Sequence, residues 1–392
     1  MTAQPTPKGA WRITFLLFLF MVVNFADKIV VGLAAVPIMH DLGLDAEQFG
    51  LLGASFFFLF SISAVIVGFI ANRVATRWVL LVLALIWALA QFPMVGTVGF
   101  ATLMICRIIL GAGEGPAFSV AVHAIYKWFP DERRTLPTAV LSQGSAFGVI
   151  LAVPSLNWLI VNYSLHHAFG ALGIVGLLWS AAWLWLGKEG PLVPSAAENA
   201  HETRFSYAHL LTTPTFIGCC VATFGAYWAL SLGLTWFTAF IVQGLGFSQT
   251  AAGPISVLPW VFGASVVIIT GWLSQRLVTR GMSTRYVGAG LCGSIYVVCP
   301  PMLSEFTPVS QRGAVIAIYG AIYTLAGIIA PMVMGHIIQT AGNSMPGYLH
   351  GFAINGFVMI AAGLLGVLLL RPGTERERLL RRTAQTPQFA RG

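Results

Sequence analysis

Charged side chains are scarce in this sequence. Asp, Glu, Lys and Arg make up 9% of its 392 residues, whereas hydrophobic residues make up 57%. Soluble domains carry roughly 25% charged residues, and a soluble core cannot absorb such an apolar excess. Apolar runs of about 20 residues, the length that crosses the hydrocarbon core of a bilayer, recur from Ile13 to Leu370. The composition therefore predicts an all-α membrane protein whose main surroundings are the lipid bilayer.

Motifs of other protein classes are also missing. The five cysteines fall within apolar runs, without the spacing of a zinc site or a disulfide framework. The chain has no His-Glu-x-x-His, no Gly-x-Ser-x-Gly and no phosphate-binding glycine loop, so we do not expect an enzyme. The net charge of +8 comes from short loops and a tail rather than a basic groove, so nucleic acid is not an expected partner. We expect no metal and no other cofactor.

Hydropathy and the positions of glycine and proline predict about eleven spans. They are expected near residues 13–37, 49–71, 78–97, 100–123, 136–162, 168–187, 216–242, 252–274, 286–304, 314–339 and 350–370. The longest polar interruption splits the chain near its middle. The expected regions are an N-terminal helical half (1–187), a cytoplasmic linker (188–213), a C-terminal helical half (214–370) and a basic cytoplasmic tail (371–392).

The basic residues indicate how the helices are oriented. Apart from Lys28 and Arg107, every Lys and Arg lies before the first span, in alternate loops or in the tail. Short loops rich in Lys and Arg stay in the cytoplasm. We therefore expect both termini in the cytoplasm. This arrangement requires an even number of spans, and eleven spans break that parity.

A loop motif is repeated in the two halves. Gly68, Asn72, Arg73 and Arg77 have the spacing Gly-x-x-x-Asn-Arg-x-x-x-Arg, and Gly271, Gln275, Arg276 and Arg280 repeat it with Gln in place of Asn. The first copy resembles the signature of the major facilitator superfamily, which has Asp at the position of Asn72. The resemblance implies two six-helix halves around a central cavity, with these loops acting in conformational change.

The second half is short in one place. The stretch from Arg77 to Arg133 holds two expected spans, whereas the matching stretch from Arg280 to Arg312 is shorter by about one membrane helix with its turn. We predict that a segment is absent between Met282 and Cys299. The alternative is a re-entrant or broken segment that is lined by protein.

Four ionisable residues lie within the expected spans: Asp27 and Lys28 in the first, Arg107 and Glu114 in the fourth. An unpaired charge costs roughly 2.5–3.5 kcal/mol at a helix centre, so these residues should face one another or a watery cavity. Arg107 and Glu114 lie two turns apart on one helix face, whereas adjacent residues cannot share a face. The charges indicate either an ion-paired scaffold or a site for protons and anions.

Three segments resemble one particular family of this superfamily. Asn24–Lys28 (Asn-Phe-Ala-Asp-Lys), Arg107–Pro116 and Lys127–Pro130 are similar to stretches of the anion:cation symporter family. The resemblance implies proton-coupled import of a small organic carboxylate by alternating access across a bacterial inner membrane, and we expect a monomer. It assigns proton coupling to Asp27 and Glu114 and substrate binding to Lys28 and Arg107.

Further polar and aromatic residues of the spans are candidates for lining the cavity. They are Asn24, Gln143, Tyr227, Trp228, Tyr319, Tyr323 and Asn355. Aromatic residues of membrane helices more often face lipid or pack against neighbours. Two other functions stay open. One is a proton/drug antiporter, which has less need of the two buried cations. The other is a sensor that does not transport, if one span is truly absent from the protein. The sequence does not specify which carboxylate is carried.

Overall fold

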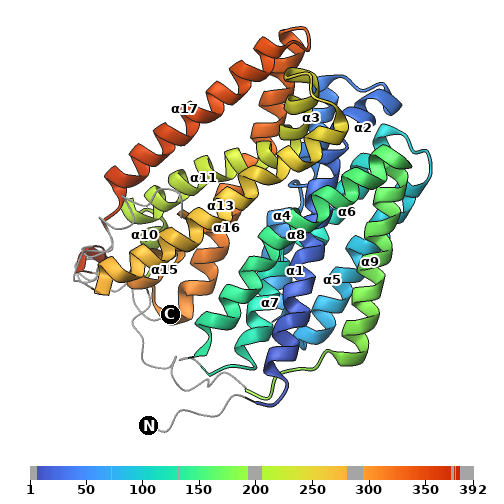
Figure 1. Cartoon of the computed structure of the whole chain (residues 1–392). Helices are drawn as coiled ribbons and strands as arrows, with labels where there is room; N and C mark the ends of the chain where they lie inside the picture. The colour runs from blue at the N-terminus through green and yellow to red at the C-terminus, as the bar shows by residue number, and fades with distance from the viewer. Residues whose placement is uncertain are drawn as a thin grey trace, which may run out of the picture. The chain divides into compact units, whose positions relative to one another are not determined.

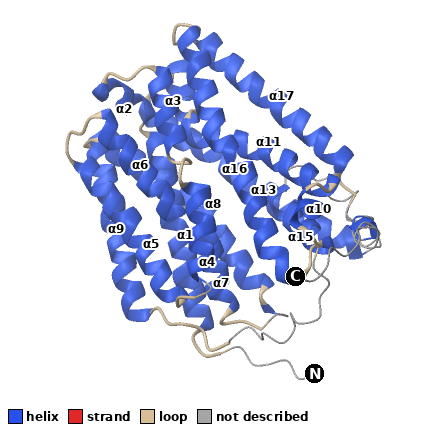
Figure 2. Ribbon diagram, turned by 180° about the vertical axis from the view of Figure 1, so that it is seen from behind, coloured by secondary structure: helices blue, strands red, loops and turns tan. Residues whose placement is uncertain are grey.

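The computed structural model describes residues 7–71, 73–130, 133–192, 205–279 and 295–371, with 375 and 377–379. These residues form helices and connecting loops, and no strand occurs among them (Figure 2). The helices are α1 (Ala10–Leu33), α2 (Ala35–Leu42), α3 (Ala46–Ser55), α4 (Phe60–Ala71), α5 (Thr76–Gln91), η1 (Phe92–Val95), α6 (Phe100–Glu114), α7 (Ala117–Tyr126), α8 (Thr135–Asn162), α9 (Leu165–Leu186), α10 (Tyr207–Leu211), α11 (Pro214–Thr235), α12 (Phe237–Ala239), η4 (Phe240–Gly244), α13 (Gln249–Thr279), α15 (Ile295–Phe306), α16 (Val309–Thr340) and α17 (Met345–Leu369).

Nine stretches of the described residues are long and apolar enough to cross a membrane. The prediction of an all-α membrane protein is therefore confirmed. Helix α13 overlaps the expected span near 252–274, and α15 overlaps the described part of the one near 286–304, but neither is among these nine stretches. The intervening residues 280–294 lie outside the described part of the chain, so the absence of a segment between Met282 and Cys299 stays a prediction.

The chain divides into two compact units that do not follow its order. Unit 1 consists of Met1–Pro194, Leu230–Phe262 and Gly327–Ala353. Unit 2 consists of Ser195–Ala229, Gly263–Ala326 and Ile354–Gly392. The long helices α11, α13, α16 and α17 therefore each contribute residues to both units.

Helix α1 lies in the middle of the first six spans of unit 1, with α8 beside it (Figure 1). Two glycines of α8 permit this approach, because a Cβ atom at Gly144 or Gly148 would lie 2.7 Å from Phe18 O or 2.6 Å from Val22 O. On another side of α1, the indole of Trp179 in α9 donates a hydrogen bond of 2.8 Å to Leu16 O. These contacts fix the position of the helix that carries Asp27 and Lys28.

Two spans of unit 1 are interrupted near their middles. Residues Phe56–Leu59 separate α3 from α4, and Gly115 and Pro116 separate α6 from α7. Proline has no backbone N–H and disrupts a continuing helix, which accounts for the second break. At the start of α3, Asp45 caps the helix by accepting a 2.8 Å bond from Gln48 N. The breaks place loop-like backbone at the depth of the charged residues of α1 and α6.

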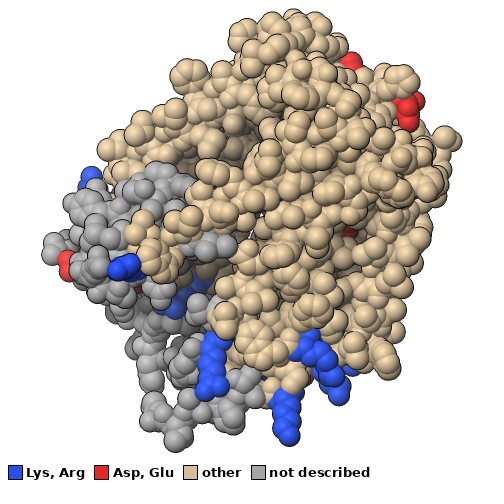
Figure 3. Space-filling model, viewed as in Figure 1, with Lys and Arg blue, Asp and Glu red and all other residues tan. Residues whose placement is uncertain are grey.

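The charged side chains of unit 1 are sorted between its two ends. Figure 3 shows Lys and Arg gathered at the end where α1 begins and Asp and Glu at the opposite end. We call these the basic end and the acidic end. The basic end includes Arg77 and Lys127, and the acidic end includes Asp41, Asp45 and Glu47.

At the acidic end, α3 begins against the last turns of α16, which also belong to unit 1. Nδ1 of His336 lies 2.6 Å from Oε1 of Glu47, and Gln339 accepts a 3.2 Å bond from Ala46 N. A Cβ atom at Gly335 would lie 2.4 Å from the backbone oxygen of Ala46. The two helices thus touch through their backbones, and polar side chains lie beside the contact.

Unit 2 has an apolar core with a few buried polar contacts. Cys219, Cys220, Cys299, Met302, Leu303, Phe306 and Tyr319 belong to this core. The hydroxyl groups of Thr223 and Tyr319 lie 2.6 Å apart, and Gln311 forms two hydrogen bonds with the backbone of Phe205. The described cysteines, Cys106, Cys219, Cys220 and Cys299, are free and buried.

Candidate functional site

The four charged residues of the first and fourth spans come together inside unit 1. Lys28 on α1 lies with its Nζ 3.3 Å from Oε2 of Glu114 on α6, and it donates a 2.6 Å bond to Oδ1 of Asn24. Glu114 is fully buried, and the side chain of Lys28 is 10% exposed. The predicted proximity of the charges is thus present, and Asn24 joins them.

Asp27 points away from Lys28, toward α5. Its Oδ1 accepts a 2.8 Å hydrogen bond from Nε2 of Gln91, the last residue of α5. Arg107 contacts the backbone of Asp27 rather than its carboxylate, with Nη1 3.5 Å from the carbonyl oxygen. Asp27 and Lys28 therefore contact different partners, because adjacent residues of a helix point in different directions.

Aromatic rings surround the two cations. The Lys28 ammonium lies 4.4 Å from the ring centre of Phe25 and 5.4 Å from that of Phe60, and the Arg107 guanidinium lies 4.8 Å from that of Phe56. Each ring presents its electron-rich face to a desolvated cation, a contact worth about 2 kcal/mol. The rings stabilise positive charge without neutralising it, so the cations stay able to attract an anion.

Gly111 of α6 and Gly115, which follows the helix, bring these rings into reach. A Cβ atom at Gly111 would lie 1.7 Å from Phe56 O, and one at Gly115 would lie 2.0 Å from Phe60 O. Any larger residue would push the interrupted α3–α4 span away from α6. The Gly-Ala-Gly-Glu-Gly stretch therefore has a packing role beside the charge at Glu114.

The cluster has balanced formal charge and incomplete hydrogen bonding. Asp27 and Glu114 offset Lys28 and Arg107, and each of the four is nearly or fully buried. Within the described part of the chain, Oδ2 of Asp27, Oε1 of Glu114, Nε of Arg107, Nδ2 of Asn24 and Oε1 of Gln91 have no hydrogen-bond partner. Buried polar atoms are nearly always satisfied in proteins, so this concentration of unpartnered ones makes the cluster the candidate functional site.

The remaining candidates do not all lie in this cluster. Gln143 lies half-buried on α8 in unit 1. The other five belong to unit 2, where Tyr323 lies with its ring centre 5.1 Å from that of Tyr227 and 4.9 Å from that of Tyr319. Trp228 and Asn355 are the remaining two, and Oδ1 of Asn355 has no hydrogen-bond partner among the described residues. Unit 2 thus holds an aromatic and hydroxyl group of its own.

Sequence reasoning did not identify Gln91, Phe56 or Phe60. A polar amide in the otherwise apolar run from Trp78 to Gln91 is a signal that could have pointed to the first. The two phenylalanines carry no such signal, because phenylalanine is common throughout the chain and the break between α3 and α4 is not marked by proline.

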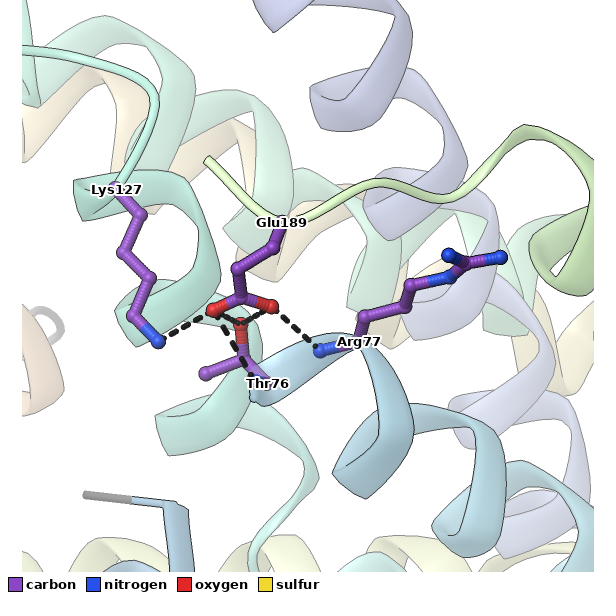
Figure 4. Close-up of polar contacts among 4 residues, drawn as sticks. All are labelled: Thr76, Arg77, Lys127 and Glu189. Carbon is purple, nitrogen blue, oxygen red and sulfur yellow. Dashed lines mark hydrogen bonds and ion pairs between the residues drawn. The ribbon is translucent and has the colours of Figure 1, made fainter. Parts of the chain in front are cut away.

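A second polar network joins three loops at the basic end (Figure 4). Glu189, three residues beyond α9, accepts hydrogen bonds from the backbone N–H of Thr76 at 3.3 Å and of Arg77 at 3.0 Å, where α5 begins. It also accepts from the Thr76 hydroxyl and forms an ion pair with Lys127, which follows α7. A carboxylate at a helix N-terminus satisfies free N–H groups and complements the helix dipole.

Burial of Glu189 by itself raises the pKa of its carboxyl. The hydrogen bonds from Lys127, the Arg77 N–H and Thr76 outweigh this effect, and the net pKa is below the ordinary value. Glu189 was not singled out from the sequence, because it lies in the stretch expected to be a linker. It ties the repeated loop motif to the end of the first half.

The other residues of the loop motif are less informative. Gly68 has open space around its Cβ position, Arg73 is exposed, and Arg276 in α13 stacks on Trp272 with 5.1 Å to the ring centre. Asn72, Arg280, the side chain of Gln275 and the surroundings of Gly271 lie outside what the structure describes. Their role in conformational change therefore stays a prediction.

The chain resembles known transporters over nearly its whole length. It is 26% identical over 381 residues to the hexuronate transporter of Bacillus subtilis (strain 168), covering 93% of this chain and 89% of that protein. It is 23% identical over 407 residues to the D-galactonate transporter of Escherichia coli O6:H1, covering 90% and 93%. A probable galactarate/D-glucarate transporter of Bacillus subtilis (strain 168) is 23% identical over an alignment of 429 residues, covering 93% and 94%.

Solved structures share the fold at low sequence identity. A bacterial homologue of the human lysosomal transporter Spinster, crystallised in an inward-facing and unoccupied conformation, matches with a TM-score of 0.74 at 17% identity, over 95% of this chain and 99% of that one. A D-xylose–proton symporter matches with a TM-score of 0.70 at 17% identity, over 91% and 97%.

The sequence model of the Major Facilitator Superfamily matches residues 16–293 and 284–391. These two stretches cover most of the chain, and the relatives and structural neighbours are transporters rather than enzymes. The chain therefore belongs to the major facilitator superfamily and is a multi-pass membrane transport protein.

Proposed function

We propose that this protein is a secondary transporter that imports an organic carboxylate together with protons, by alternating access of a central site. The observation that carries the proposal is the buried, charge-balanced cluster of Asp27, Lys28, Arg107 and Glu114. A scaffold that merely held helices together would need fewer charges and would leave fewer polar atoms unsatisfied.

The charge balance favours symport of anion and proton. A substrate carboxylate that enters the cluster adds one negative charge to a site that has two positive and two negative groups. An uncompensated charge within the membrane is costly. Protonation of Asp27 or Glu114 restores the balance, so anion and proton are expected to bind together. Lys28 and Arg107 then supply the attraction for the carboxylate, and the unpartnered Nε of Arg107 is a free donor for it.

The relatives favour sugar acids as the substrate class. Their names assign them hexuronate, galactarate or D-glucarate, and D-galactonate, which all combine a carboxylate with several hydroxyl groups. Amides such as Asn24 and Gln143 suit hydroxyl groups, since an amide can both donate and accept. We place the basic end of unit 1 in the cytoplasm of a bacterial inner membrane, with both termini on that side and the protein acting as a monomer.

The decisive experiment measures substrate and proton fluxes together. Purified protein in liposomes is given labelled hexuronate, galactonate, glucarate, an aromatic acid and a cationic drug, with and without an inward proton gradient, while a pH-sensitive dye inside records proton entry. We expect gradient-driven accumulation of at least one sugar acid with matching proton entry. Export of preloaded cationic drug driven by the inward proton gradient indicates the antiporter instead, and uptake of a sugar acid without proton entry contradicts proton coupling.

A transport-dead sensor stays the second candidate because of the short region in the second half. The two family-model matches meet at residues 284–293, inside the interval where a segment is expected to be absent. The alignment of 429 residues to one relative also exceeds the 392 residues of this chain, so that relative has residues that this chain lacks. Binding of a sugar acid without any uptake or exchange supports the sensor. A reporter fused after Arg382 that reads cytoplasmic supports an intact alternation of spans.

A further inference from the structure

Gln91 is a buried amide placed against one of the two acidic residues of the cluster. It is fully buried, ends α5, and donates from Nε2 to Oδ1 of Asp27 at 2.8 Å. Its own Oε1 and the second carboxylate oxygen of Asp27 have no hydrogen-bond partner in the described part of the chain. Asp27 and Gln91 therefore each keep one oxygen atom that accepts no hydrogen bond from a described group.

The contact gives the two oxygens of Asp27 different roles. Oδ1 accepts from an amide that cannot give up its proton, whereas Oδ2 accepts from no described group. The charged groups that face Asp27 are Lys28 on its own helix and Arg107 and Glu114 on α6. None of these cations lies within 4 Å of the Asp27 carboxylate among the described residues, since Lys28 pairs with Glu114 and Arg107 contacts the Asp27 backbone. The side chain that orients the carboxylate is therefore a neutral amide.

A neutral partner suits a group that gains and loses a proton. A carboxylate fixed by a close cation resists protonation, because the cation stabilises the charged form. An amide donor holds the carboxylate in place with a weaker preference for the charged form. By contrast, the Glu114 carboxylate is already engaged by Lys28.

We propose that Gln91 is a positioning residue that orients Asp27 so that Oδ2 is the oxygen that takes the coupling proton. The inference rests on the proposed function, since it assigns a role within proton coupling. Gln91 touches neither substrate nor proton in this assignment and acts through Asp27. A purely structural role, in which Gln91 fills space between α5 and α1, makes a different set of predictions.

The test is a length exchange across the contact. Gln91→Leu removes the hydrogen-bond donor and keeps a side chain of similar size. Gln91→Asn shortens the side chain by one methylene and so moves the amide away from Asp27. Asp27→Glu/Gln91→Asn lengthens the acidic side chain by one methylene, which restores the distance between the amide and the carboxylate. Trp87→Phe, one turn earlier on α5 and packed on Phe20, is the control for altered packing. Uptake by each variant in liposomes is followed from pH 5 to pH 8, with exchange of internal for external substrate measured in parallel.

We expect Gln91→Leu to move the pH of half-maximal uptake upward by about one unit or more, because the charged form of Asp27 loses its donor. Exchange should continue, and Trp87→Phe should keep the wild-type pH profile. The double variant should recover more of that profile than Gln91→Asn alone. A wild-type pH profile in Gln91→Leu, or failure of the double variant to improve on Gln91→Asn, overturns the proposal. If Gln91→Leu does not fold, the comparison of Gln91→Asn with the double variant still decides. A wild-type protein whose uptake ignores pH contradicts the proposed function itself, and not the placement of Gln91.

Discussion

Lys28 and Glu114 form an ion pair between α1 and α6, with 3.3 Å between Nζ and Oε2. Under the proposed function, Lys28 also attracts the substrate carboxylate, and the Glu114 carboxylate already lies beside its ammonium. Binding of an anion therefore competes with the pair, and the displaced Glu114 becomes an uncompensated buried acid unless it takes up a proton. Under the proposed function, this pair links substrate entry to the charge of Glu114, and Asp27 takes the coupling proton.

The two acidic residues should be needed for proton-driven accumulation. Asp27→Asn and Glu114→Gln keep the size of each side chain and remove its titration. We expect both variants to lose accumulation against a gradient, whereas exchange of internal for external substrate continues, because exchange does not require the return of an empty, deprotonated carrier. Full accumulation by both variants would mean that the two acids only hold the helices together.

The two cations should be needed for substrate binding. Arg107→Ala removes a donor group and leaves the acids short of one buried positive charge. We expect affinity, measured by calorimetry or by scintillation proximity, to fall by about 30-fold or more, which corresponds to the 2–5 kcal/mol lost when a desolvated charge pair is broken. Lys28→Arg should bind more tightly than Lys28→Ala, because arginine keeps the charge and adds a planar pair of donors. Normal binding by Arg107→Ala together with lost binding by Asp27→Asn and Glu114→Gln would reverse the assignment of cation and acid roles.

Much of the helical fold and the buried charge cluster could be predicted from the sequence. The apolar spans follow from hydropathy, and the charges at 27, 28, 107 and 114 were expected to face one another or a watery cavity because isolated charges are costly in a bilayer. The sequence did not reveal which charge meets which. That depends on the rotation of α1, which the close approach of Gly144 and Gly148 to its backbone helps to set.

The contacts of Gln91, Phe56 and Glu189 escaped prediction for a common reason. Each joins segments far apart in the chain, and its importance comes from what the partner segment presents. Glu189 and Thr76 are separated by 113 positions, so no local pattern links them. Only the folded arrangement shows that an acid after α9 caps α5.

Glu189 should stabilise the basic end in a pH-dependent way. Its folded-state pKa is depressed, so its contribution is present above the ordinary pKa of a glutamate and is lost as the pH falls through the lowered folded value. We expect Glu189→Gln to lower the melting temperature by about 2 °C at pH 7, a small effect because the group is partly exposed to solvent. The difference from wild type should shrink below about pH 4, near the ordinary glutamate value.

The control for this measurement is Glu47→Gln, which removes a more exposed carboxylate at the acidic end. A melting temperature of Glu189→Gln that equals wild type at pH 7 would show that the cap and the Lys127 pair contribute nothing measurable. A difference that grows on acidification would contradict the depressed pKa.

The contact between α3 and α16 at the acidic end should control opening on that side. A Cβ atom at Gly335 would lie 2.4 Å from the backbone oxygen of Ala46, and one at Gly50 would lie 2.5 Å from that of Pro331, so neither contact can relax by moving a side chain. Gly335→Ala should therefore prevent the close approach and favour states in which the acidic end is open. We expect uptake to fall by at least about tenfold, because obstruction of this backbone contact costs about 1.4 kcal/mol or more. A cysteine placed at Ala46 should become more reactive toward an impermeant thiol reagent. Gly320→Ala is the matched control on the same helix, because its Cβ position has open space. Equal uptake and equal labelling in the two alanine variants would show that this contact does not limit transport.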